Sequence, residues 1–291
     1  MFLQQVINGL TIGSSYALVA VGFSMVFGVL ELTNFAHSSV FMLGAYIAAA
    51  VLANHFGIWM AVAGSIALCG IFGILIDRMA LMPMRKRGAS RVSYLICTIG
   101  LSTFLQNLIQ MIFGAEARPF PKVFIQGQLE FGNAMITYLQ IFVICITLAL
   151  MLITWFLVNY TSMGAAMRAV AQNATAARLM GINVDTTITF TFFLGSALAA
   201  VAGIMVGMYY RSVDLTLGFT VGMKTFASAV LGGIGILPGA VLGGFSIGVL
   251  ESLFAGYISS GFKDAVAFIV LIGVLLIKPA GLLGKKHVSK V

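Results

Sequence analysis

Apolar runs about as long as a bilayer is thick recur along this chain, and they constrain its fold more than any other feature. They lie at residues 6–29, 58–76, 92–113, 138–158 and 186–210. Only 8% of the residues are charged and 60% are hydrophobic, which excludes a soluble domain of 291 residues. The runs also lack the short alternating pattern of an outer-membrane β-barrel. The sequence therefore predicts an all-α polytopic membrane protein whose residues 1–291 form a single membrane domain.

Shorter or interrupted apolar stretches complicate the number of crossings. Apolar character resumes at 40–53 after a polar stretch at 31–39. The stretch at 223–257 is broken by glycines and Pro238, and a last apolar segment covers 258–277. Three crossings after residue 222 would give about nine spans, whereas one crossing with a re-entrant hairpin would give about seven. We expect about eight to nine transmembrane elements, some of them short or broken.

The basic residues indicate how the chain is oriented in the membrane. Eleven of the 16 Lys and Arg residues fall at 77–91, at 159–185 and beyond 277: Arg78, Arg85, Lys86, Arg87, Arg91, Arg168, Arg178, Lys278, Lys285, Lys286 and Lys290. The positive-inside rule makes this side cytoplasmic. Three spans before residue 77 then place the N-terminus outside and the C-terminus inside. These positions at segment ends suit lipid contact in a bacterial-type inner membrane and argue against nucleic acid as a partner.

The loop at 159–185 is not built like an ordinary connector. Ser162 is a candidate N-cap for a first short helix, and Asn173 or Thr175 for a second, which Gly181 would end. Seven alanines leave the surface of these helices small and smooth. Such a segment can fit a groove in another protein, or it can lie on the surface of the bilayer.

Glycines predict closely packed helices in the last third of the chain. They recur four residues apart: Gly203 and Gly207, Gly235, Gly239 and Gly243, and Gly244 and Gly248. Small residues at this spacing let helix backbones approach each other in lipid. We expect Gly235 and Pro238 at a turn, with Gly239 and Gly243 at a packing face. A short similarity between residues 13–20 and 195–202 also suggests an inverted repeat.

Lys224 and Glu251 are the only charged residues in the stretch from 223 to 257. If the helices on either side of a turn at 237–238 fold back antiparallel, both residues lie about 20 Å from the turn. A lone charge in a bilayer costs at least about 2.5–3.5 kcal/mol, which favours a pair. In the alternative arrangement, Lys224 reaches the outer headgroups and Glu251 faces a water-filled route.

The chain has none of the common catalytic or phosphate-binding motifs. It lacks G-x-x-x-x-G-K-[ST], so it cannot cradle ATP phosphates by itself, and we expect no cofactor in this chain. Cys69, Cys97 and Cys145 lie inside apolar runs without metal-type spacing, so we expect no metal site. A membrane enzyme is disfavoured. The membrane subunit of an ATP-driven transporter and a self-contained secondary transporter or channel remain, and the scarcity of ionisable residues within the spans favours the first.

Four motifs, in order along the chain, resemble the branched-chain amino acid ABC importer permease family of LivH type. They are GSSYAL at 13–18, NFAH at 34–37, the segment from Met163-Gly164 to Gly181-Ile182-Asn183, and the stretch at 223–240. The resemblance implies a second related permease subunit, two cytosolic ATPase subunits that bind ATP and Mg²⁺, and an extracytoplasmic binding protein. The cargo would be branched-chain amino acids, other amino acids, or urea and short amides.

The resemblance also implies functional residues. The loop at 159–185 would contact the ATPase, with Gly164, Arg168, Asn173, Ala177 and Gly181 as the coupling residues. Ser38-Ser39 departs from the family pattern of a small and an acidic residue after the histidine, so an acidic contribution there is not expected.

Three polar residues are candidates for the translocation route. Asn34, His37 and Ser38 interrupt apolar sequence where a broken helix would expose unpaired backbone to a cavity. We predict that they line or gate the route. The alternative is that His37 caps a helix or binds a neighbouring carbonyl.

Overall fold

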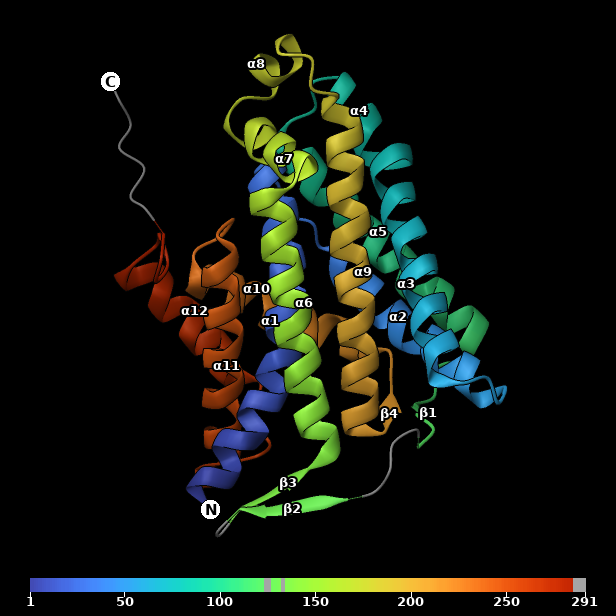
Figure 1. Ribbon diagram of the computed structural model, residues 1–291, viewed down its shortest axis with the longest axis vertical. Helices are drawn as coiled ribbons and strands as arrows, with labels where there is room; N and C mark the ends of the chain where they lie inside the picture. Colours follow the sequence, from blue (N-terminus) through green and yellow to red (C-terminus); the bar gives the residue numbers. More distant parts are fainter. Residues whose placement is uncertain (123–126, 132–133, 285–291) are drawn as a thin grey trace.

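Seven helices in the described part of the chain are long and apolar enough to cross a membrane (Figure 1). The computed structural model describes residues 1–122, 127–131 and 134–284. The seven are α1 (Phe2–Leu30), α2 (Ala36–Ala53), α3 (Ile58–Leu75, continued by the π-helix η1, Ile76–Leu81, and by α4, Met82–Lys86), α5 (Arg91–Phe113), α6 (Tyr138–Tyr160), α9 (Val184–Tyr210) and α11 (Leu237–Tyr257). The prediction of an all-α polytopic membrane protein is confirmed.

Two shorter helices, α10 (Thr216–Gly232) and α12 (Ala265–Ile277), pack beside α11. The described part of the chain thus holds seven candidate spans, with α10 and α12 as shorter helices beside them. At about 1.5 Å per residue α12 is only about 20 Å long, so by itself it is too short for a full crossing.

Short strands close the end of the molecule at which the N-terminus lies (Figure 1). β2 (Gln128–Phe131) and β3 (Ala134–Thr137) form an antiparallel hairpin, and β1 (Arg118–Pro119) pairs antiparallel with β4 (Ser212–Val213). The helices α4, α7 (Ser162–Gln172) and α8 (Ala174–Leu179) lie at the opposite end. The two basic segments at 77–91 and 159–185 therefore share one end, as the predicted orientation requires. The predicted cytoplasmic C-terminus falls on residues 285–291, outside the described part.

The helices divide into an inner and an outer group. Within an apolar stretch of 18 residues in each helix, 78% of the residues are buried in α1 and in α2 and 72% in α9, against 17% in α5 and 22% in α6. The inner helices form one continuous hydrophobic core. The exposed apolar side chains of α5 and α6 must therefore face lipid or another membrane subunit, because exposure of so much apolar surface to water is unfavourable.

Glycines allow α11 to pack closely against two neighbours. A Cβ at Gly244 or Gly248 would collide with the backbone of α1, and one at Gly239 or Gly243 would collide with backbone carbonyl groups of α10. The four-residue spacing places both pairs at helix contacts, as predicted. α1 and α9 run in opposite directions in Figure 1, as an inverted repeat would need, but the repeat itself stays a prediction.

The turn between α10 and α11 uses glycine for its backbone conformation. Gly235 has φ +86° and lies against Gly28 of α1, and its N–H donates to Ser24 Oγ at 2.9 Å. Pro238 occupies the first turn of α11, where its missing N–H leaves no helical bond unmade. The expected turn is therefore present, and it is anchored to α1.

Two boundary predictions are wrong. α2 begins at Ala36 rather than at Val40, so His37 and Ser38 lie in its first turn and not in a polar loop. The N-cap of α7 is Thr161 rather than Ser162, because the Thr161 hydroxyl accepts the Gly164 N–H at 3.1 Å. In both places polar residues form the start of the helix, several positions before the apolar pattern begins. The spacing of apolar residues therefore does not show where the first turn lies.

Candidate functional site

A cavity of about 260 Å³ lies among α1, α2, α5 and α10. Asn34, His37 and Ser38, the three candidate route residues, all line it. Its other polar lining comes from α5 and α10, and its aromatic lining from α1, α10 and the residue before α2: Ser102, Thr103, Gln106 and Thr225, and Phe23, Phe35, Phe219 and Phe226. The structure thus brings the predicted residues together around one space.

The start of α2 positions these side chains. Asn34 Oδ1 accepts the Ala36 N–H at 3.1 Å, and Ser38 Oγ donates to the Phe35 carbonyl at 2.9 Å. Both groups therefore satisfy backbone at the start of the helix while they border the cavity. The step from α1 to α2 is only five residues long, 31–35, so the chain turns back at the cavity wall.

His37 is buried, with 3% of its surface exposed. Its ring hydrogen-bonds the backbone of Val19, while its Nε2 atom has no hydrogen-bond partner among the described residues. Nε2 packs against Gly22 of α1, where an added Cβ would lie 3.0 Å away. His37 thus combines both expected possibilities, since it borders the cavity and binds a neighbouring carbonyl.

The loop at 159–185 folds as two short helices at the end of the molecule away from the N-terminus (Figure 1). Asn173 lies between them and caps α8, with its Oδ1 accepting the Ala176 N–H at 2.9 Å. Gly181 has φ +84°, a conformation that favours glycine, and its N–H donates to the Arg178 carbonyl at 3.1 Å. The expected helix–helix segment with a terminating glycine is present, and Asn173 rather than Thr175 is the cap.

The model of one protein family, described as branched-chain amino acid transport system / permease component, matches residues 5–275. The chain belongs to this permease family. It is 42% identical to the high-affinity branched-chain amino acid transport system permease protein LivH of Salmonella typhimurium, over 100% of this chain and 98% of that protein. It is 40% identical, with the same coverage, to the permease protein BraD of Pseudomonas aeruginosa.

The fold also has a counterpart among solved structures. A chain in the structure of PsaBC from Streptococcus pneumoniae in complex with Fab aligns over 96% of this permease and 93% of its own length, with a TM-score of 0.52 and 13% identity. At that identity the likeness concerns the fold alone. The arrangement of helices is therefore shared with a protein of very different sequence.

The permease holds a buried charge cluster where Lys224 meets Glu251. Lys224 Nζ lies 2.6 Å from Glu251 Oε1 and 2.6 Å from Asp264 Oδ1, and Tyr16 Oη donates to Glu251 Oε2 at 3.0 Å. The side chains of Lys224 and Glu251 are 4% and 2% exposed, so the sequence-based pairing matches a direct contact. The cluster joins α1, α10, α11 and the start of α12.

Sequence reasoning missed two members of this cluster. Asp264 fell within the last apolar segment, 258–277, and was given no role, and Tyr16 was noticed only as part of the GSSYAL motif. A tyrosine among small residues in a span is the available signal, because its hydroxyl needs a partner when it is buried. Lys224 does not line the cavity, although its neighbours Met223 and Thr225 do, so the cluster supports the cavity wall from behind.

Several predicted coupling residues face the interior of the permease. Gly164 and Ala177 are buried, and a Cβ at Gly164 would collide with the carbonyl of Val158. Arg168 donates to that same carbonyl. These residues shape the segment through packing within the chain, and their contact with an ATPase stays a prediction.

The exposed surface of the segment is different from the one expected. Leu179 and Met180, which directly follow the buried Ala177 turn, are 84% and 82% exposed. Leu179 and Met180 lie at the polar end of the molecule that carries α7 and α8. An exposed apolar pair in such a place is typical of a contact with another protein. The signal in the sequence was an apolar pair just before the terminating Gly181, and it was overlooked beside the alanines.

Proposed function

We propose that this permease is a membrane subunit of an ATP-driven importer of branched-chain amino acids. The observation that carries the proposal is the full-length similarity, at 42% identity, to a protein named as a high-affinity branched-chain amino acid transport permease. The chain has no phosphate-binding loop, so ATP and Mg²⁺ would bind to two separate cytosolic ATPase subunits. A second related permease subunit and an extracytoplasmic binding protein would complete the assembly.

The chemistry of the cavity supports this cargo. Among the described residues, those that line it carry no carboxylate, ammonium or guanidinium group. Its volume equals that of about nine water molecules, which suits a small solute. Aromatic and aliphatic side chains would contact an apolar side group, while uncharged hydroxyl and amide groups would solvate a zwitterion without favouring either net charge.

The transport activity is tested in liposomes that contain the complete assembly. We expect uptake of leucine, isoleucine and valine that requires ATP, the ATPase subunits and the binding protein, because the chain itself cannot capture the energy of ATP. A panel with other amino acids, urea and short amides defines the cargo. Uptake by the permease alone, driven by a proton or sodium gradient, would instead support a secondary transporter.

A variant that fills the cavity links the uptake to this site. Ser38 packs against Gly222 across the cavity wall, so Ser38→Phe should block uptake while the assembly still forms. Cys145→Phe, on the exposed face of α6, is the matched control and should transport normally. Equal uptake by the two variants would place the route elsewhere.

A second prediction concerns the surface that meets the ATPase. Leu179→Asp together with Met180→Asp should leave the permease folded but reduce co-purification of the ATPase subunits at least tenfold, about the effect of losing a small hot spot. Ala177→Trp should instead lower the yield of the permease itself, because Ala177 is buried in its own chain. Undiminished co-purification of the double Asp variant would remove Leu179 and Met180 from the interface.

A further inference from the structure

The α3 helix changes its winding near the end that carries α7 and α8. It passes at Ile76 into the π-helical segment η1, which runs to Leu81, and then into α4. Pro83 lies in the first turn of α4, and its ring would clash with the carbonyl four residues earlier in a regular α-helix. The wider turns of η1 relieve this conflict. π-helical turns of this kind are frequent at functional sites.

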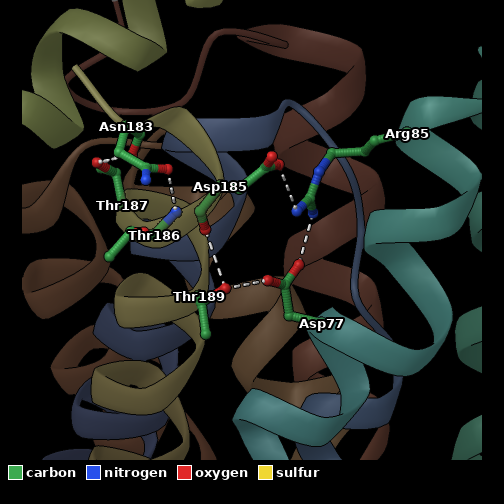
Figure 2. Close-up of polar contacts among 7 residues, drawn as sticks. All are labelled: Asp77, Arg85, Asn183, Asp185, Thr186, Thr187 and Thr189. Atoms are coloured by element: carbon green, nitrogen blue, oxygen red, sulfur yellow. Dashed lines mark hydrogen bonds and ion pairs between the residues drawn. The ribbon is translucent and has the colours of Figure 1, made fainter. Parts of the chain in front are cut away.

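A buried carboxylate lies inside this π-helical segment. Asp77 is 0% exposed, and Arg85 Nη1 donates to its Oδ1 at 2.5 Å (Figure 2). Thr189 Oγ1 of α9 donates to its other oxygen at 2.6 Å. The carboxylate is therefore held by the guanidinium group of Arg85 from α4 and by the hydroxyl group of Thr189 from α9. It has no part in lining the transport cavity, and the apolar core does not require a charged group at this position.

Arg85 has a second carboxylate within reach. Arg85 Nη2 lies 3.6 Å from Asp185 Oδ1 in the first turn of α9 (Figure 2). The Nη2 atom is buried and has no hydrogen-bond partner among the described residues. Asp185 is partly exposed, with 32% of its side chain accessible. At 3.6 Å the contact is an ion pair but is longer than a hydrogen bond. A small shift of the first turn of α9 would either close it or break it.

The first turn of α9 is tied to α8 through a short connection. α8 ends at Leu179 and α9 begins at Val184, and the Ile182 N–H donates to the Ala177 carbonyl at 3.0 Å. Asn183 Oδ1 accepts the Thr186 N–H at 3.1 Å and caps α9 (Figure 2). A displacement of α8 must therefore move Asp185, because only a bonded turn separates them.

Beyond the π-helical segment, α3 and α9 pack closely against each other, and α9 packs closely against α2. A Cβ at Gly70 or Gly73 of α3 would collide with side chains of α9, and one at Gly203 of α9 would collide with the Phe41 carbonyl of α2. The first turn of α2 borders the transport cavity. Tightly packed elements of this kind transmit a shift because they do not deform continuously.

We propose that Asp77, Arg85, Asp185 and Thr189 form a coupling cluster that carries movement of α8 to α3 through the first turn of α9. They are positioning residues, and the inference rests on the proposed function of the permease in an ATP-driven importer. Arg85 stays with Asp77 while the distance to Asp185 changes with the position of α8. The π-helical segment supplies the adjustable joint at which α3 responds.

The test measures leucine uptake and ATP hydrolysis in the same liposomes, with the complete assembly. Asp185→Asn and Thr189→Val should assemble and hydrolyse ATP at the parental rate, whereas uptake per ATP should fall about tenfold, within the usual range of coupling effects. Arg85→Met combined with Asp77→Asn, which leaves no lone buried carboxylate, should behave similarly, and Arg85→Lys alone should keep part of the ratio. Arg78→Gln and Arg87→Gln, exposed in the same segment, are controls that should keep the parental ratio.

Amide hydrogen exchange of residues 76–81 provides a readout that does not depend on the cargo. Binding of ATP to the parent assembly should change this exchange, and the change should be absent in Asp185→Asn. A cluster that acts only as a structural brace predicts either an unchanged uptake per ATP in every assembled variant or a parallel loss of uptake and hydrolysis, and both results would overturn the coupling role. No change of exchange in the parent would overturn it as well. Leucine uptake that fails in the parent while the exchange response persists would count against the proposed cargo alone.

Discussion

Lys224→Met should remove most of the folded permease. The substitution leaves the carboxylates of Glu251 and Asp264 without the ammonium group that lies 2.6 Å from each. Removing one partner of a buried ion pair costs about 3–5 kcal/mol, because the remaining charge stays in an apolar environment. A protein with about 5–15 kcal/mol of stability loses a large part of it. Thermal unfolding of the detergent-purified variant, together with its yield in membranes, measures the effect.

The other members of the cluster provide the controls. Asp264→Asn should be mild, because Asp264 is 49% exposed and Lys224 keeps Glu251. The triple variant with Lys224→Met, Glu251→Leu and Asp264→Asn should regain much of the stability, since no lone charge remains. A charge exchange between positions 224 and 251 needs Asp264→Asn as well, because a glutamate at 224 would face Asp264. A Lys224→Met permease as stable as its parent would show that the cluster contributes little.

Gly248→Leu should prevent α11 from packing on α1. A Cβ at this position already overlaps the backbone of Gly13, and a leucine adds further atoms in the same direction. Overpacking of a core by side chains costs about 1–3 kcal/mol, and here the cost should exceed that range because backbone cannot move aside as a side chain does. The expected result is a loss of monodisperse protein in size-exclusion chromatography after extraction from the membrane.

Glycines on open helix faces make the comparison specific. Gly64 of α3 and Gly273 of α12 have nothing within 4 Å of an added Cβ, so Gly64→Leu and Gly273→Leu should yield normal amounts of protein. Both replace glycine by leucine within an apolar helix, so they match the change in helix propensity and hydrophobicity. If Gly248→Leu is recovered as well as these two, the close contact between α1 and α11 is not needed for folding.

Local sequence patterns predicted the membrane elements and the small-residue faces. Span positions follow from apolar length, and the sharing of one end by the two basic segments follows from the positions of Lys and Arg. The Gly244 and Gly248 spacing repeats once per helical turn, which is enough to assign both to one face. The Lys224–Glu251 contact was predictable because only two charges lay in one hairpin.

The helix starts and the buried positions of the segment at 159–185 were harder to predict from the sequence. The first turn of α2 begins four residues before the apolar run, because Asn34 rather than an apolar residue organises it. Ala177 and Leu179 stand two positions apart in the same short helix, yet one is buried and the other is exposed. A run of alanines has no periodic contrast from which to read the buried face.

The sequence by itself determined that the chain spans the membrane repeatedly, where its helices lie, and which residues would gather at the start of α2. Only the tertiary structure decided which distant groups meet: Asp264 and Tyr16 at Lys224, and Thr189 at Asp77. Asp77 and Thr189 are 112 residues apart, and a local pattern carries no information about a contact over that distance. The packing of α3 on α9 brings Asp77 and Thr189 together. Burial of the Asp77 carboxylate is tolerated there because a cation and a hydrogen-bond donor converge on it.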